Sequence, residues 1–316
     1  MLEIGVQTKN AIEDTHPQDG YELLKRVGFK NVDFSLNSYL TNTDLYQNTL
    51  NKFFDRSIGE LEDYFDPHKS GAKAAGIVIN QMHMPYPVYI PTGKKEVNEY
   101  LWNEVAPKSM QICKYLECPY IVIHGYKMAR YLGSEDAEWA HTSELLEYLA
   151  PMAKEMGITL CIENLYDGPA GHLMEGPCCD VHKAVERIDD FNDRYGAEVL
   201  GFCFDTGHAN LVGLDFERFL TTLGHRLKVL HIHDNDGKYD LHQIPFTFTK
   251  TRENRPSTDW DGFIRGLRAI HFDKVLSFET APVLTSFPNE MKEDALALIA
   301  RIGAYFANEI QNVEDR

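Results

Sequence analysis

Residues 199–234 read VLGFCFDTGHANLVGLDFERFLTTLGHRLKVLHIHD, and this stretch decides the fold. The apolar runs at 199–206 and 227–234 have the length and composition of buried strands, and an amphipathic segment near 215–224 separates them. A strand, a helix and a strand in that order predict two parallel strands joined by a crossover helix. Both predicted strands end in residues that can bind a metal.

The same alternation continues along the rest of the chain. Further strand-like runs lie at 2–8, 31–37, 76–84, 120–125, 159–165 and 274–280. Amphipathic segments lie between the runs, near 18–28, 56–75, 95–117, 136–156, 179–195 and 259–270, with a last one near 289–310. Eight such units predict an α/β fold, a (β/α)₈ TIM barrel. Because no Pro/Gly/Ser-rich linker divides the chain, we expect a single domain over residues 1–316.

Composition narrows the classes of partner. The chain carries 31 basic and 48 acidic residues, a net charge of −17, and has no basic stripe of the kind that binds nucleic acid. Its six cysteines form no CxxC pair, which favours a reduced cytoplasmic setting. No apolar stretch reaches membrane-spanning length, and the N-terminus lacks a signal-peptide pattern. We therefore expect a cytoplasmic protein whose partner is a small molecule.

Four residues at the ends of predicted strands have the chemistry of a metal site. Within each strand, polar residues of one parity would face the barrel interior while large apolar residues face the helices. In this barrel class the carboxyl ends of the strands carry the chemistry. Three carboxylates and one imidazole suit Mn²⁺, Zn²⁺, Mg²⁺ or Co²⁺. The predicted ligands are Glu163, Asp205, His233 and Glu279, with His231 placed deeper in the interior.

Two of these carboxylates are also candidates for acid and base. A divalent metal that holds the carbonyl and hydroxyl oxygens of a ketone favours an enediolate, and a carboxylate on each side can then move a proton between carbons. Glu163 and Glu279 are the candidates for this pair.

An outer ring of residues is assigned to substrate binding, with alternatives open. His208, in DTGH, could contact substrate or a second metal, or cap a helix. His83 and His124 end two strands, where a lone histidine is often satisfied by backbone and water. Asp240 and His242 are spaced so that both can reach one centre from an extended loop, or they form a simple turn. In the long loop that follows, Lys250, Arg252 and Arg255 could bind a substrate anion or stay solvated.

These motifs together resemble the xylose isomerase-like TIM-barrel superfamily, in particular its sugar phosphate isomerase/epimerase branch. The segments that carry the resemblance are HMPYP, VIHG, CIEN, FDTGH, HIHDNDG with DLH, the later DW and the final FE. The resemblance spans nearly the whole chain. It implies one metal on Glu163, Asp205, His233 and Glu279, a proton-transfer pair of glutamates, and a substrate contact for His208. The function it implies is a metal-dependent isomerase or epimerase of a small sugar, sugar phosphate or related ketone.

The same superfamily includes the endonuclease IV type of AP endonucleases, which gives an alternative function. Their trinuclear zinc site draws on residues that resemble His83, His124, His208, Asp240 and His242, so a second or third metal and phosphodiester hydrolysis stay open. The net charge of −17 disfavours a nucleic-acid substrate. A sugar-binding barrel without activity is a third reading, which the presence of all four core ligand types disfavours. The IPFTFTKTRENRPST loop departs from the Gly-rich turn of related chains.

Overall fold

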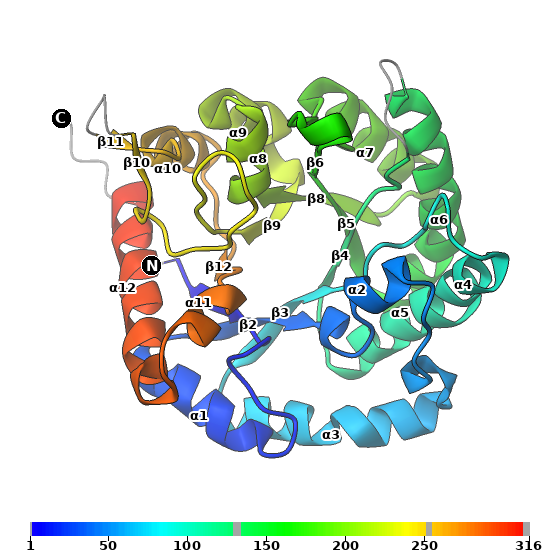
Figure 1. Cartoon of the computed structure of the whole chain (residues 1–316), viewed down its shortest axis with the longest axis horizontal. Helices are drawn as coiled ribbons and strands as arrows, with labels where there is room; N and C mark the ends of the chain where they lie inside the picture. Colours follow the sequence, from blue (N-terminus) through cyan, green and yellow to red (C-terminus); the bar gives the residue numbers. More distant parts are fainter. Residues whose placement is uncertain (1, 129–133, 251–254, 312–316) are drawn as a thin grey trace.

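The computed structural model describes residues 2–128, 134–250 and 255–311. Eight parallel strands form a barrel with helices around its outside (Figure 1). The sheet order is β12-β1-β2-β3-β4-β5-β8-β9, and the ends of the sheet meet where Ile232, just past β9, bridges to Phe278. The strands are β1 (Ile4–Gln7), β2 (Asn31–Ser35), β3 (Val78–His83), β4 (Tyr120–Ile123), β5 (Thr159–Glu163), β8 (Leu200–Asp205), β9 (Leu227–His231) and β12 (Leu276–Phe278). The predicted TIM barrel is confirmed.

Every predicted amphipathic segment forms a helix on the outside of the barrel. These helices are α1 (Pro17–Val27), α3 (Ile58–Ala75), α4 (Lys95–Tyr100) with α5 (Ala106–Tyr115), α6 (Glu135–Met156), α7 (Val181–Tyr195), α9 (Phe216–Leu223), α10 (Trp260–Ala269) and α12 (Lys292–Gln311). Local signals set their ends: a capping box of Ser57 and Glu60 begins α3, and Gly76, at φ 70°, ends it.

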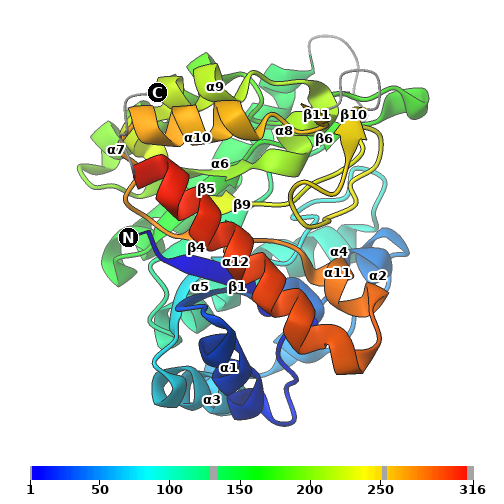
Figure 2. The same cartoon turned by 90° about the vertical axis from the view of Figure 1, so that its left-hand side faces the viewer.

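The loops at the carboxyl ends of the strands contain further short elements. They are α2 (Asn42–Tyr46), α8 (Thr206–Val212), α11 (Ala281–Ser286) and two small hairpins, β6 (Tyr166–Asp167) with β7 (Met174–Glu175) and β10 (Thr249–Lys250) with β11 (Arg255–Pro256). In the side view of Figure 2, α2 and α11 lie near each other toward the right, with β10 above them, while α12 runs across the outside of β1. These loops build the rim that carries the candidate site.

The barrel interior and the layer between barrel and helices have separate apolar cores. Val122, Cys161, Cys203 and Val229 form a small cluster inside the barrel. Residues of the opposite parity face the helices: the ring of Phe204 lies 5.3 Å from that of Phe216 and is fully buried. Each such buried ring stabilises the fold by roughly 1.5–3 kcal/mol. The inside and outside faces of the strands were therefore predicted correctly.

In the parts of the chain that the structure describes, every helix is too short or too polar to cross a bilayer.

Candidate metal centre

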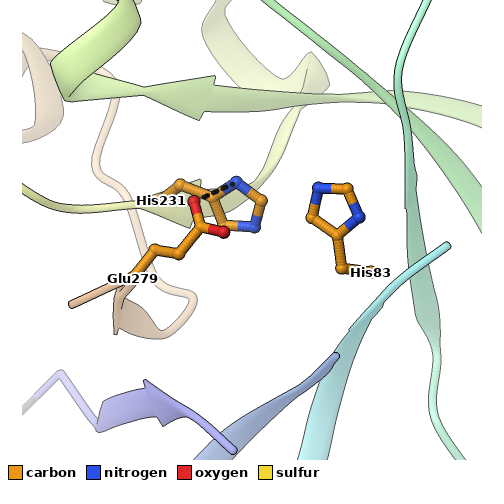
Figure 3. Close-up of side chains that lie close together, drawn as sticks. All are labelled: His83, His231 and Glu279. Carbon is orange, nitrogen blue, oxygen red and sulfur yellow. Dashed lines mark ion pairs between the residues drawn. The ribbon is translucent and has the colours of Figure 1, made fainter. Parts of the chain in front are cut away.

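Three carboxylates and one imidazole meet at the carboxyl ends of four strands. Glu163, Asp205, His231 and Glu279 are all buried, and one ligand atom from each lies within 4.8 Å of the others. Nδ1 of His231 is 3.0 Å from Oε1 of Glu163, 3.4 Å from Oε2 of Glu279 and 3.9 Å from Oδ2 of Asp205. Figure 3 shows His231 and Glu279 paired, with His83 facing them from β3. This cluster, called the core set below, has the donor types of a divalent-metal site.

The imidazole of the core set differs from the one chosen in the sequence analysis. Pairing of β8 with β9 shifts by one residue between Phe202 and Cys203, so that His231 lies beside Asp205. His233 lies beyond the end of β9, with Nε2 3.0 Å from Oδ2 of Asp205. The structure therefore places His231, rather than His233, among the three carboxylates, because the shift in register brings it to their level.

Gly207 explains where the ring of His233 lies. A Cβ atom on Gly207 would sit 1.9 Å from Cε1 of His233, so only glycine leaves room for this imidazole. Asp205, just before it, accepts a hydrogen bond from the backbone N–H of His208 and thereby caps α8. The DTGH segment thus fixes one carboxylate and two imidazoles at once.

A second group of ligand atoms lies beside the core set and shares Glu163 with it. Nε2 of His124 is 3.0 Å and Nε2 of His83 is 3.7 Å from Oε2 of Glu163, and the two imidazole nitrogens are 3.2 Å apart. Oε2 of Glu163 is buried without a hydrogen-bond partner of good geometry among the described residues. Two imidazoles and a carboxylate that converge in this way are suited to a zinc-type cation.

A third group of ligand atoms also adjoins the core set, near Glu163 and Glu279. Oδ2 of Asp240 is 3.1 Å from Nε2 of His242 and 3.4 Å from Nε2 of His208. The ring of His242 also stacks on that of His233, with centroids 4.0 Å apart. The structure therefore brings together all five residues that the sequence analysis assigned to substrate binding, in two groups that flank the core set.

Backbone carbonyl groups fix the tautomers of three flanking histidines. Nδ1 of His83 lies 2.7 Å from the carbonyl oxygen of Met84, and Nδ1 of His208 lies 3.0 Å from that of Asn164. Nδ1 of His242 has the same contact, at 3.0 Å, with the carbonyl oxygen of Glu279. Because a carbonyl oxygen only accepts, Nδ1 donates in each case, and the neutral ring presents the lone pair of Nε2 to the site. Ligating histidines are commonly held in this way.

The carboxylates of the core set are held ionised by their histidine neighbours. Burial raises the pKa of Glu279, but His231 and His242 more than reverse this and lower it to about 2. Burial likewise raises the pKa of Glu163, and the nearby His231 and His124 bring it well below its usual range. Both glutamates are therefore anionic at neutral pH, the state that a metal requires of them.

The surroundings of two flanking histidines shift their pKa values in opposite directions. Burial lowers the pKa of His242, but Asp240 and Glu279 together raise it to about 9. For His124, burial dominates and lowers the pKa to about 4. Without a metal, protons on some imidazoles thus offset the buried carboxylates. A divalent cation would replace these protons, so the residues present fit a metal.

Three residues that the sequence analysis did not select support the core set. Nε2 of His231 lies 3.0 Å from Oδ2 of Asp33, and Gln7 donates a 2.7 Å hydrogen bond to Oε1 of Glu279. Asn164 joins β5 to β8 by two 2.9 Å hydrogen bonds with the backbone of Asp205. Gln7 and Asp33 occupy the alternate positions of the first two strands that face the barrel interior. This alternation is the feature of the sequence that could have identified them.

A cavity of about 270 Å³ opens onto the site. Glu163, Glu279 and the five flanking residues line it, whereas Asp205, His231 and His233 do not. Its wall also includes Tyr46, Tyr86, Tyr89, Tyr166 and Lys127. A larger cavity of about 770 Å³ lies elsewhere, near Asn31, Tyr120 and Phe272, and none of the ligand groups lines it. The ligand groups that line the smaller cavity, rather than its volume, therefore identify it as the candidate functional cavity.

The expected anion contacts of the long loop cannot be placed. Arg252 lies outside the described residues, as do the side chains of Lys250 and Arg255.

Comparison with known proteins now identifies the family. The profile described as xylose isomerase-like TIM barrel matches residues 22–301. The chain belongs to the xylose isomerase-like TIM-barrel family. The resemblance that the strand-end motifs indicated is thereby confirmed.

Curated relatives of this xylose isomerase-like chain carry different names. Inosose isomerase of Bacillus velezensis is 23% identical over 230 residues, which cover 71% of this chain and 72% of that protein. The probable endonuclease 4 of Natranaerobius thermophilus is 27% identical over 188 residues, or 54% of this chain and 57% of that protein. The uncharacterized protein y4fM of Sinorhizobium fredii is 36% identical over 87 residues, 28% of this chain and only 25% of that protein's length.

Solved structures share the fold of the whole barrel. A D-psicose 3-epimerase determined in the presence of D-fructose has a TM-score of 0.66 and 14% identity, covering 97% of this chain and 99% of that one. An IolI protein with a bound zinc atom has a TM-score of 0.62 and 16% identity, covering 98% of each chain. At this level of identity the likeness establishes the fold.

Proposed function

We propose that the protein is a divalent-metal-dependent isomerase or epimerase that acts on a small sugar or related ketone through an enediolate. The observation that carries the proposal is the pair Glu163 and Glu279, which both line the cavity and both lie against His231 of the core set. The names of two relatives, inosose isomerase and D-psicose 3-epimerase, agree with this reaction class.

Glu163, Asp205, His231 and Glu279 would hold the metal, with Mn²⁺, Zn²⁺, Mg²⁺ and Co²⁺ all compatible with the donor set. The IolI structure, which contains zinc, supports a metal in this fold. A divalent cation held there would polarise the carbonyl and hydroxyl oxygens of an α-hydroxy ketone and so acidify the hydrogen on the carbon that bears the hydroxyl group.

The two glutamates would then move the proton. We assign Glu279 as the base because Gln7 fixes its Oε1 atom, while its Oε2 atom faces His231 and His242. Glu279 would remove the proton from the carbon next to the carbonyl. Glu163, after taking a proton from one of the imidazoles that contact it, would deliver that proton to the opposite face, which inverts the carbon. The flanking residues His83, His124, His208, Asp240 and His242 would contact the sugar hydroxyls along the cavity wall.

The cavity favours an uncharged sugar over a sugar phosphate. Lys127 is its one lysine and no arginine lines it among the described residues, and the ammonium of Lys127 lies over the ring of Tyr166 at 4.8 Å. A phosphate would meet the carboxylates of Glu163, Asp240 and Glu279 in the same space. A cytoplasmic location remains part of the proposal, and the six cysteines, all buried free thiols, agree with it.

The proposal is tested by interconversion of ketoses. The chelated protein is reloaded with Mn²⁺, Zn²⁺, Mg²⁺ or Co²⁺ and incubated with tagatose, psicose, fructose and inosose, and the products are separated by chromatography. We expect conversion of at least one substrate that depends on metal and is lost in Glu279→Gln. Failure of every metal and substrate pair would contradict the proposal.

A second candidate is phosphodiester hydrolysis, which the two flanking ligand groups favour because they would give three neighbouring metal sites. The net charge of −17 disfavours hydrolysis of nucleic acid, since a protein that binds nucleic acid needs positive side chains to neutralise the phosphate charges. Metal analysis separates the two candidates: one metal per chain would remove the chemical basis for the hydrolase, whereas three metals with cleavage of abasic DNA would favour it.

A further inference from the structure

We propose that a second cavity beside the catalytic one binds another sugar ring, so that the preferred substrate is a neutral glycoside or disaccharide. This inference rests on the proposed function, because the reacting ring would occupy the cavity at the metal centre.

The second cavity has a volume of about 570 Å³, and Tyr89, Trp102, Tyr126 and His141 line it. Tyr89 also lines the catalytic cavity of about 270 Å³. Gly125, the residue before Tyr126, lines the catalytic cavity as well. The two spaces are therefore neighbours that share the wall formed by Tyr89. A ligand of two linked rings could pass over this wall and fill both.

The rings around the second cavity are held in place by stacking. Tyr89 and Tyr126 stack with centroids 4.8 Å apart and planes at 15°, and His141 continues the stack at 5.6 Å from Tyr126. Trp102 stacks on Tyr148 at 5.4 Å. Rings fixed in this way lose little entropy when a ligand arrives, and their apolar surfaces suit the C–H faces of a sugar.

An unusual backbone segment carries the tryptophan. Residues Leu101–Val105, between α4 and α5, form a π-helix. Such segments are rare, cost more than an α-helix and frequently occur at functional sites. Trp102 and Asn103 of this segment both line the second cavity. The irregular turn therefore contributes an aromatic face and an amide to the same space, the pair of groups that a sugar ring needs.

The paired charges of the second cavity favour a neutral ligand. Lys95 pairs with Glu99 at 3.0 Å, and Nδ1 of His141 lies 3.7 Å from Glu144. These four are the ionisable side chains, apart from tyrosines, that line the second cavity among the described residues, so it has no uncompensated cationic group for a phosphate. Hydroxyl groups of a sugar can bond to these carboxylates and to Asn103.

Calorimetric titration tests the inference with glucose, maltose and cellobiose as probes. The proteins are the wild type, Trp102→Ala, and Tyr305→Ala, a control that removes a half-exposed ring from α12. We expect at least one disaccharide to bind more tightly than glucose, and Trp102→Ala to weaken that binding roughly three- to tenfold while leaving glucose binding unchanged. Tyr305→Ala should match the wild type.

The outcomes separate this inference from the proposed function. Ketose interconversion without any Trp102-dependent preference for a disaccharide would overturn the second subsite and leave the isomerase intact. Trp102-dependent disaccharide binding without ketose turnover would support the subsite and count against the isomerase. Equal weakening of glucose and disaccharide binding in Trp102→Ala would overturn the subsite, and so would the absence of sugar binding to the wild type.

Discussion

Nε2 of His231 lies 3.0 Å from Oδ2 of Asp33, and both side chains are fully buried on facing strands of the barrel. Gln81 donates a 3.2 Å hydrogen bond to the same carboxylate oxygen. The contact between His231 and Asp33 lacks hydrogen-bond geometry, but a carboxylate at this distance favours a proton on Nε2 through its charge and leaves Nδ1, which faces Glu163, as the nitrogen for a metal. We infer that Asp33 positions His231 within the core set.

Asp33→Asn should weaken metal binding by about 10- to 100-fold, because an amide no longer favours the required tautomer of His231. Affinity is measured by competition with a chelator. Asp14→Asn is a matched control, since Asp14 also accepts a histidine contact, from His68 at 3.0 Å, but lies outside the core set. An equal change in affinity for both variants would mean that Asp33 acts only through stability.

The choice between His231 and His233 is tested by their alanine variants. His231→Ala should lower metal affinity by more than about 100-fold, because it removes a direct ligand. His233→Ala should lower it less, since His233 contacts Asp205 but is not a member of the core set. Chelator competition and metal content after dialysis give the measurement. The reverse order of the two variants would restore the assignment made from sequence.

Gly207→Ala should displace the ring of His233, because the added Cβ would overlap it. We expect a loss of stability of about 1–3 kcal/mol in urea denaturation, together with weaker substrate binding. Gly59→Ala is the control: a Cβ atom added to Gly59, in α3, would have no heavy atom within 4 Å, so this change should be neutral or slightly stabilising. Wild-type stability in Gly207→Ala would show that His233 can move without cost.

Asp14 gives a prediction for pH. A hydrogen bond with His68 is the main cause that lowers the pKa of Asp14 below its usual 3.8, with burial opposing it and Tyr39 adding to it. A folded-state pKa below the unfolded one means that Asp14 stabilises the fold fully above about 3.8 and that this contribution is lost as the pH falls through the lower value. The stability difference between wild type and Asp14→Asn should therefore shrink below about pH 4. A difference that grows in acid would contradict this sign.

The sequence was sufficient to predict the barrel because its eight strands are short apolar runs bounded by long amphipathic segments. It missed α2, α8 and α11, since helices of five to seven residues are set by local caps such as the Asp205 side chain rather than by periodicity. It also missed both small hairpins, whose strands have two residues each.

The sequence likewise predicted the candidate site only in part. Strand-end position and side-chain chemistry were enough to bring Glu163, Asp205 and Glu279 together. The sequence analysis chose His233 and did not anticipate the register shift between β8 and β9, which brings His231 among the three carboxylates while His233 lies with His242 and Glu279; which imidazole binds a metal stays a prediction. Contacts across the barrel, such as that of Asp33 with His231, depend on the closure of the sheet and so could not be derived from neighbours in sequence.

Deuterium exchange tests the central claim most directly. Metal-loaded protein is incubated with the ketose panel in D₂O, and deuterium at the carbon next to the carbonyl is followed by NMR. The account predicts incorporation into at least one ketose, reduced by about 100-fold or more in Glu279→Gln, which removes the base and one ligand of the core set; metal content is measured in the same samples so that the two losses are separated. Absence of exchange with every ketose, or undiminished exchange in Glu279→Gln, would contradict it.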